Sequence, residues 1–235
     1  MAADTTGWLH VRDVDDETAE VCVGADRPVV LASVVKVLLV LEFARQAALG
    51  QIDVTERVRV RQEDQLGGVG TAACRDDIDM SWRDLALFAM MLSDNTAADL
   101  LFRRVGLDNV QALASELGLC HTRVTGGPRQ LLQSLFDDVG AADAATFAKV
   151  FPTLSRARVA GASWQRLAAA FDEDVSVAAK SGSVLGIRNE VGVLTYPDGR
   201  RYAAAVFTAG PPGRRPDIEA AIGRAARRAV DRLRA

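Results

Sequence analysis

Residues 32–40 read ASVVKVLLV, a stretch that places a serine and a lysine at the start of an otherwise apolar helical pattern. Ser33 and Lys36 are three residues apart, so a helix would bring both side chains onto one face. A serine hydroxyl becomes a good nucleophile when a base removes its proton, and a lysine of lowered pKa can be that base. The same spacing also fits a serine that caps the helix and a lysine whose amine reaches solvent. The pair therefore needs support from elsewhere in the chain.

The helix that begins near Ser33 and ends at Leu49–Gly50 lies between strand patterns at the two ends of the chain. Short apolar segments, bounded by polar turns, predict a hairpin before it and three strands near the end of the chain. A final amphipathic helix follows these strands. The predicted strands and the final helix cover residues 8–14, 19–25, 175–182, 190–196, 202–210 and 216–234.

The middle of the chain has a different pattern. Residues 51–80 are polar and contain few strand signals. Residues 81–92 begin with the capping pair Ser81 and Asp84 and are apolar almost all round, which predicts a buried helix. Further helices are expected over Thr96–Val105, from an Asp108 cap to Gly118, and within residues 141–170.

These patterns predict an α+β fold. The simplest arrangement is an antiparallel sheet that is built from both chain ends and flanked by helices, with an all-helical region inserted between them. We expect one domain over residues 1–235, with an α/β part at about 1–50 and 160–235 and a helical part at about 51–159.

The composition limits the kinds of partner. With 49% hydrophobic residues, 25% charged residues and a formal net charge of −3, the chain lacks the basic excess of a nucleic-acid-binding protein. No apolar run is long enough to span a membrane. The first residues do not form a signal peptide, so we expect a cytoplasmic protein, or an exported one if a leader has been removed. A monomer without nucleic-acid or membrane partners is expected.

The cysteine and histidine residues argue against a metal centre. Cys22, Cys74 and Cys120 are odd in number, far apart and without the short spacing of a zinc site. His10 and His121 are the only histidines in the sequence. We therefore expect free, partly buried thiols, no metal ligands and no cofactor.

Two further motifs carry polar side chains where elements end. Residues 93–95 read SDN directly after the predicted buried helix, and a helix cap would explain only one of these three side chains. Residues 180–182 read KSG at the end of an apolar strand. Such a strand can hold a substrate carboxylate, because lysine supplies charge and small residues let backbone N–H groups approach a developing oxyanion. An exposed edge strand that is blunted by lysine is the alternative.

The three motifs occur in the order S-x-x-K, S-D-N and K-[ST]-G, which is the signature of class A β-lactamases and penicillin-binding proteins. The segments RPVVLASVVKVLLVLEFARQ, MSWRDLALFAMMLSDNTAADLL and YPDGRRYAAAVFTAG are similar to the corresponding segments of that family. The step of 60 residues from Ser33 to Ser93 also fits class A proteins. The chain thus resembles the penicillin-recognising serine hydrolase superfamily over essentially its whole length.

The resemblance implies roles for the first two motifs. Ser33 would be the acylated nucleophile, and Lys36 would be the base or part of the proton relay. Ser93 would pass a proton to the leaving nitrogen, and Asn95 would hold the substrate's side-chain amide and help to position Lys36. Asp94 is expected to be a structural turn residue that faces inward.

For the third motif, the resemblance implies that Lys180 and Ser181 bind the substrate carboxylate. The backbone N–H groups of Ser33 and Ser183 would form the oxyanion hole.

One element of the class A pattern is missing. Class A enzymes carry a glutamate within an E-x-x-L-N sequence that activates the water of deacylation, and this chain has no such sequence. The usual step from Ser93 leads to residues 125–134, which contain no carboxylate and would place Arg129 at the glutamate's position. The nearest acidic residues, which we expect to cap or flank helices and which remain candidate bases, are Asp137, Asp138 and Asp143.

We therefore expect a serine hydrolase of β-lactamase type that acylates on Ser33 and deacylates slowly, since loss of a general base lowers a rate by roughly 10²–10⁴. Its substrate would be a small molecule, either a β-lactam or an acyl amide or ester that bears a carboxylate. Two alternatives remain open. One is a peptidase, esterase, amidase or acyl transferase of the same fold, and the other is a non-catalytic penicillin-binding or sensor domain.

Overall fold

The computed structural model describes residues 4–133 and 166–235. These residues form two compact units, one made of residues 4–34 and 166–235 and the other of residues 35–133. Each unit has its own apolar core. None of the helices within the described ranges is both long and apolar enough to cross a membrane.

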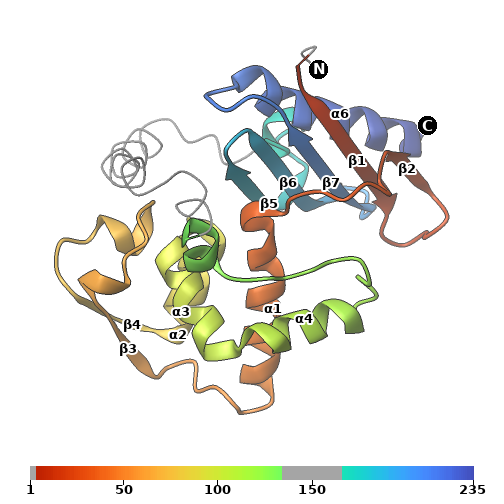
Figure 1. Ribbon diagram of the computed structural model, residues 1–235. Helices are drawn as coiled ribbons and strands as arrows, with labels where there is room; N and C mark the ends of the chain where they lie inside the picture. Colours follow the sequence, from red (N-terminus) through yellow and green to blue (C-terminus); the bar gives the residue numbers. More distant parts are fainter. Residues whose placement is uncertain (1–3, 134–165) are drawn as a thin grey trace. The chain divides into compact units, whose positions relative to one another are not determined.

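The first unit is built on a five-stranded antiparallel sheet with the strand order β2-β1-β7-β6-β5 (Figure 1). Both ends of the chain enter this sheet, because β1 pairs with β2 on one side and with β7 on the other. The strands are β1 (Thr6–Asp13), β2 (Glu20–Val23), β5 (Ser176–Val184), β6 (Ile187–Thr195) and β7 (Arg201–Ala209). The predicted antiparallel sheet is confirmed.

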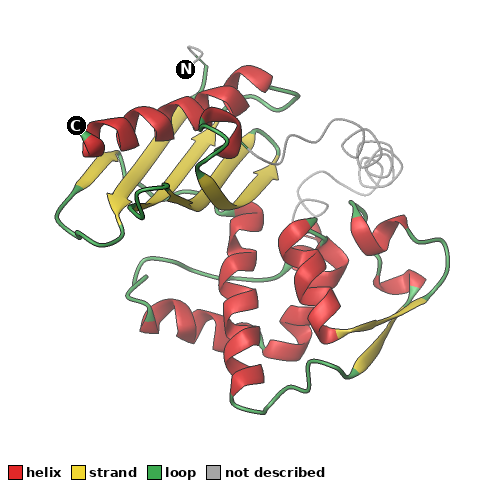
Figure 2. Cartoon of the chain, turned by 180° about the vertical axis from the view of Figure 1, so that it is seen from behind, coloured by secondary structure: helices red, strands yellow, loops and turns green. Residues whose placement is uncertain are grey.

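The C-terminal helix α6 (Pro216–Arg234) runs across one face of this sheet (Figure 2). Its side chains Ile218 and Ile222 are buried in one cluster with Tyr202 and Val206 of β7. Buried residues recur every second position along β7 and every third or fourth position along α6. These two periods place the core of the unit between the sheet and the helix.

The second unit is mainly helical. Its core is formed where α1 packs against α2, α3 and α4, with Leu39, Phe43, Leu85 and Leu101 at its centre. The helices are α1 (Lys36–Ala48), α2 (Trp82–Met91), α3 (Asn95–Val105) and α4 (Leu107–Glu116), and a two-stranded sheet contains β3 (Arg57–Val60) and β4 (Ile78–Ser81). Short 3-10 turns of this unit are η2 (Gln62–Asp64) and η3 (Gly70–Ala73). The turn η4 (Ala168–Ala170) belongs to the first unit, and η1 (Ala32–Val35) lies where the chain passes from the first unit to the second.

The prediction of an all-helical insertion is wrong in one respect, because β3 and most of β4 lie within the segment 51–80. The sequence RVRV of β3 alternates polar and apolar residues, and this alternation is the strand pattern that the prediction missed. Val58 and Val60 pack on the helical core, whereas the two arginines of the strand are exposed.

Three helix predictions can also be compared with the structure. Ser81 caps α2 as predicted, since its hydroxyl oxygen accepts a hydrogen bond from the Asp84 backbone N–H (3.1 Å). The prediction that α2 is buried all round is wrong, because Leu87 and Met91 are exposed. Asp108 lies in the first turn of α4 and does not cap it. The helix predicted within 141–170 lies largely outside the described residues.

Candidate active site

Lys36 is the first residue of α1 and is only 1% exposed. Its Nζ donates hydrogen bonds to the backbone carbonyl of Ser93 (2.6 Å) and to the side-chain oxygen of Asn95 (2.8 Å), and lies 3.3 Å from Ser93 Oγ. These oxygens replace the water that the buried amine has lost. The structure therefore brings the SDN motif into contact with the lysine of the first motif. The Lys36 amine does not reach solvent, as it would if Ser33 and Lys36 only capped and flanked a helix.

Asp94 holds the SDN turn and faces inward, as expected. Its carboxylate accepts hydrogen bonds from the backbone N–H and the hydroxyl of Thr71 (2.6 and 3.0 Å) and from the backbone N–H of Ala97 (3.0 Å). Ser93 has a left-handed φ of +54°. This conformation costs a non-glycine residue roughly 1–3 kcal/mol and persists where the surroundings fix it. The anchored Asp94 fixes the turn in which Ser93 and Asn95 reach Lys36.

Ser33 lies in η1, directly after Ala32, whose φ of +50° is also left-handed. The chain that leads to it is tied to the sheet by Asn189 of β6. The Asn189 amide nitrogen donates to the carbonyls of Val30 (2.7 Å) and Leu31 (3.3 Å). Asn189 thus positions the segment that ends at the predicted nucleophile.

Gly182 of β5 passes close to the same segment. A Cβ at Gly182 would lie 2.8 Å from the Leu31 carbonyl oxygen and 3.1 Å from the Ser33 backbone nitrogen, so only glycine fits without displacement. Ser183 follows Gly182 on the strand. The two backbone segments that carry the predicted oxyanion donors, at Ser33 and Ser183, are therefore neighbours.

Lys180 and Ser181 are both buried on β5. The Lys180 amine donates a hydrogen bond to the Ser181 carbonyl (2.8 Å). Burial lowers the pKa of Lys180 to about 8; the nearby Glu190 carboxylate opposes this effect and Arg166 adds to it. The predicted carboxylate-binding lysine thus has little surrounding water to compete with a bound anion.

Glu190 is a fully buried carboxyl group directly opposite Ser181 in the β5–β6 pairing. One of its oxygens accepts a hydrogen bond from the Leu167 backbone N–H, whereas the other has no hydrogen-bond partner within the described residues. Burial raises the pKa of Glu190. Its position beside the KSG strand was not apparent from any local motif.

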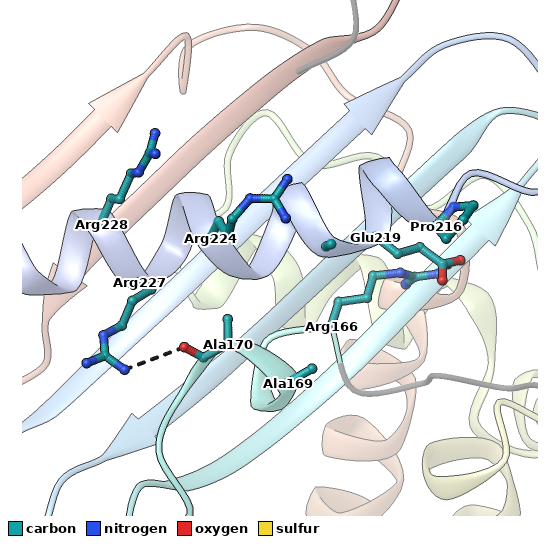
Figure 3. Close-up of a pocket in the computed structure, with 9 residues that line it drawn as sticks. Arg166, Ala169, Ala170, Pro216, Glu219, Arg224, Arg227 and Arg228 are labelled. Atoms are coloured by element: carbon teal, nitrogen blue, oxygen red, sulfur yellow. Dashed lines mark hydrogen bonds and ion pairs between the residues drawn. The ribbon is translucent and has the colours of Figure 1, made fainter.

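Arg166 is a second residue that the motifs did not reveal. Its guanidinium donates to the Ser183 hydroxyl (2.9 Å) and to the Asn189 carbonyl (3.0 Å), and lies 3.6 Å from the Glu219 carboxylate. Figure 3 shows Arg166 extending toward Glu219 at the wall of a cavity of about 460 Å³ along α6. Arg166 therefore places a fixed positive charge beside the predicted oxyanion strand.

Residues 1–233 match the sequence model of the Beta-lactamase enzyme family. The chain belongs to this family. The motifs S-x-x-K, S-D-N and K-[ST]-G that carry the resemblance lie around Ser33, Ser93 and Lys180, whose geometry is described above.

One named protein and two solved structures are similar to this chain over nearly its whole length. The Beta-lactamase regulatory protein BlaB of Streptomyces cacaoi is 26% identical, with 97% of this chain and 93% of that protein covered. The beta-lactamase from Sphaerobacter thermophilus is 25% identical and superposes with a TM-score of 0.72 over 97% of this chain and 91% of its own. A mutant of PBP-A, solved as an acyl-enzyme complex with penicillin G, is 20% identical, with a TM-score of 0.70 and coverage of 97% and 92%. The β-lactamase-like α+β fold is confirmed.

Arg129 lies where the glutamate of class A family members is expected from the sequence. Its Nε donates to an Asp99 carboxylate oxygen (3.1 Å), and its guanidinium also donates to the Asp64 carbonyl (3.2 Å). An arginine stays protonated and cannot accept a proton from water. The other candidates for a deacylating base, Asp137, Asp138 and Asp143, lie outside the described residues.

Replacing Asn189 by leucine is expected to destabilise the protein and to slow acylation. The substitution leaves the Val30 carbonyl and the Thr208 backbone N–H, which donates to Asn189 Oδ1 (3.2 Å), without their partner. A buried polar group left unsatisfied costs about 1–3 kcal/mol. Urea denaturation measures the loss of unfolding free energy.

Thr208→Val is the control for this substitution. It removes only the hydrogen bond from the Thr208 hydroxyl to the Arg188 carbonyl (2.6 Å), so acylation should be retained. Equal acylation by both variants would contradict the positioning role of Asn189.

The second-order rate constant for acylation by an anionic β-lactam is expected to fall as the pH rises through about 8, because Lys180 then loses its proton and its charge. The folded protein binds this proton less tightly than an unperturbed lysine of pKa 10.5. The buried ammonium therefore destabilises the fold below pH 8, and this penalty disappears as the pH rises from about 8 to 10.5. The second-order rate constant of acylation, measured against pH, tests the binding part.

Two variants give this pH profile its controls. Lys180→Arg keeps its charge at every accessible pH, so its profile should not fall near pH 8. Glu190→Gln removes a charge that raises the pKa of Lys180, so its profile should fall at a lower pH. A decline near pH 8 that persists in Lys180→Arg would assign it to another group.

Proposed function

We propose that this chain forms an acyl-enzyme on Ser33 with a β-lactam, or with a related amide or ester that bears a carboxylate, and releases the acyl group slowly. The observation that carries the proposal is the Lys36 amine. It is buried at the start of the helix that follows Ser33 and is hydrogen-bonded to the SDN turn. In the proposed reaction, Lys36 is the base for the serine, and the Ser93 hydroxyl beside it takes part in proton transfer.

Acylation begins when the Ser33 hydroxyl gives its proton to the neutral Lys36 amine and its oxygen attacks the substrate carbonyl carbon. The backbone N–H groups of Ser33 and Ser183 stabilise the oxyanion that forms. When the C–N bond breaks, the proton passes from Lys36 through the Ser93 hydroxyl to the leaving nitrogen. The separation of 3.3 Å between Lys36 Nζ and Ser93 Oγ supports this route.

Substrate recognition involves the remaining motif residues. The Lys180 ammonium and the Ser181 hydroxyl bind the substrate carboxylate. Arg166, which is hydrogen-bonded to the Ser183 hydroxyl, adds positive charge beside them. Asn95 uses its side-chain oxygen to accept from Lys36. Its amide nitrogen therefore remains to donate to the carbonyl of the substrate's side-chain amide.

Slow release is supported by the sequence between the second and third motifs. The chain has no E-x-x-L-N sequence, residues 125–134 contain no carboxylate, and Arg129 at the expected position is bound to Asp99. Because an arginine at that position cannot activate water, deacylation should be slower by roughly 10²–10⁴ than in an enzyme that has a glutamate there.

A second candidate function is a β-lactam sensor. It is favoured by the relative named as a regulatory protein, which is similar to this chain over nearly its whole length. A long-lived acyl-enzyme is the chemical state that such a sensor needs, so the two functions share acylation and differ in the fate of the acyl-enzyme. A hydrolase of the same fold that acts on a substrate other than a β-lactam is the remaining alternative.

Stopped-flow measurements with a chromogenic cephalosporin test the proposal. We expect a burst of one equivalent of product per protein, followed by slow turnover, and no burst with Ser33→Ala. Rapid linear turnover without a burst would contradict slow release. Absence of both burst and turnover in the folded wild-type protein would favour a substrate other than a β-lactam.

A further inference from the structure

A second group of reactive side chains lies on the β1–β2 hairpin. His10 of β1 is directly opposite Cys22 of β2, and Arg12 is opposite Glu20. Because alternate residues of a strand share a face, His10, Glu20 and Cys22 project from the same side of the hairpin. The hairpin lies at one edge of the sheet, whereas the strand that carries Lys180 lies at the other edge.

This side of the hairpin faces away from the core of the unit. Leu9 and Val11, the neighbours of His10 in β1, are buried in the cluster that includes α6. His10 is half-buried, and Glu20 and Cys22 are exposed. The three side chains can therefore reorient slightly without disturbing the packing of the sheet.

The donor atoms of the three side chains converge. One nitrogen, one carboxylate oxygen and one sulfur all lie within 4.8 Å of one another, and His10 Nε2 is 2.9 Å from Glu20 Oε2. In a tetrahedral zinc site with ordinary bond lengths, such ligand atoms are separated by roughly 3.4–3.6 Å. The separations between these atoms must change by roughly 1.4 Å at most to reach that geometry.

The kinds of donor favour zinc over the commoner divalent cations. Mg²⁺ and Ca²⁺ prefer oxygen ligands, whereas a set of imidazole, thiolate and carboxylate suits Zn²⁺. The Glu20 carboxylate already lies within hydrogen-bond distance of His10 Nε2, and the Cys22 sulfur lies near both. A cation placed between the three side chains would replace the proton that now links His10 to Glu20.

We propose that His10, Glu20 and Cys22 form a zinc-binding site, with water as the fourth ligand. Binding removes the proton of the Cys22 thiol, so the sulfur coordinates as a thiolate. The proton between His10 Nε2 and Glu20 moves to Nδ1 of the ring, so that Nε2 is free to coordinate, and Glu20 coordinates as the carboxylate. One proton leaves the protein for each ion bound when His10 is neutral.

The site would join β2, an edge strand, to β1 by a metal bridge in addition to the four residue pairs of the ladder. Three strands, β1, β7 and β6, separate β2 from β5 in the sheet order. Zinc should therefore stabilise the folded chain without taking part in acylation. Spacing along the chain did not reveal this site, because strand pairing is what brings residue 10 beside residues 20 and 22.

Titration of the reduced full-length protein with Co²⁺, in buffer free of chelators, tests the proposal. Cobalt reports its ligands, because a coordinated thiolate gives a charge-transfer band in the near ultraviolet. We expect one saturable equivalent with this band, its displacement by Zn²⁺, and release of about one proton per ion in weakly buffered solution. Zinc should also raise the melting temperature and protect one thiol from alkylation, which peptide mapping should identify as Cys22.

Matched variants assign the ligands. Cys22→Ser should abolish the band, and His10→Gln and Glu20→Gln should weaken binding by at least about tenfold. Cys120→Ser is the control, since Cys120 is also exposed and lies next to the other histidine, and it should leave the titration unchanged. A band that persists in Cys22→Ser, or no saturable binding below about 1 mM by the folded wild-type protein, would overturn the proposal.

Discussion

Replacing Lys36 by methionine is expected to lower the rate constant of acylation by roughly 10²–10⁴, the usual contribution of a general base. Methionine has nearly the same length and fills the same buried space, but it cannot accept the proton of Ser33. It also removes the donor that now contacts the Ser93 carbonyl and the Asn95 side chain. Quenched-flow acylation by penicillin G measures the rate, and urea denaturation of the same sample shows whether the variant is folded.

Lys36→Arg separates the base from the charge. An arginine keeps a positive charge and several N–H donors near the SDN turn, but it stays protonated and cannot act as a base. If Lys36 is the base, the arginine variant should be as slow as the methionine variant. An arginine variant that acylates at the wild-type rate would show that Lys36 supplies charge or structure alone, and would contradict the proposed role.

Replacing Gly182 by alanine is expected to lower the acylation rate by roughly 10²–10³, the effect of losing one oxyanion-hole donor. The added Cβ would lie 2.8 Å from the Leu31 carbonyl oxygen and 3.1 Å from the backbone nitrogens of Ser33 and Val34. These are backbone atoms, so the strand and the turn must move apart. The overpacking itself should cost about 1–3 kcal/mol of unfolding free energy.

Gly192→Ala provides a matched control for this substitution. Gly192 lies on β6, where a Cβ would meet the Ala178 carbonyl oxygen at 2.7 Å and the Ala179 Cβ at 2.9 Å. The crowding is similar, but it falls on Ala178 and Ala179 of β5 and not on the backbone at Leu31 and Ser33. We expect a comparable loss of stability with a much smaller loss of acylation. Equal losses of acylation in the two variants would indicate a general disturbance of the sheet.

The elements that could be predicted from the sequence are those whose signals are local. The capping serine of α2, the period of α6 and the alternation of the strands each depend on residues within one element. The motif residues were found for the same reason, because Ser33–Lys36, SDN and KSG are each short and contiguous. Their mutual arrangement came from the family resemblance, since no pattern of spacing by itself requires Lys36 to contact Asn95.

The supporting residues could not be predicted because they act across strands or between distant segments. Asn189 binds carbonyls at residues 30 and 31, almost 160 positions earlier in the chain. Arg166 contacts Ser183, which lies 17 positions later in the chain, and Glu190 is placed by the register of β5 and β6. Their side chains look like ordinary surface residues in the sequence, and only burial shows that they are not.

The central claim is a long-lived acyl-enzyme on Ser33, and a time course of intact mass after brief exposure to penicillin G tests it most directly. Excess penicillin is removed, the protein is followed until its original mass returns, and the modified peptide is sequenced. We predict that most of the protein gains the mass of one intact penicillin, that the adduct maps to Ser33, and that it decays far more slowly than it forms. An adduct that forms equally in Ser33→Ala, or penicillin consumption without any accumulated adduct, would contradict the account.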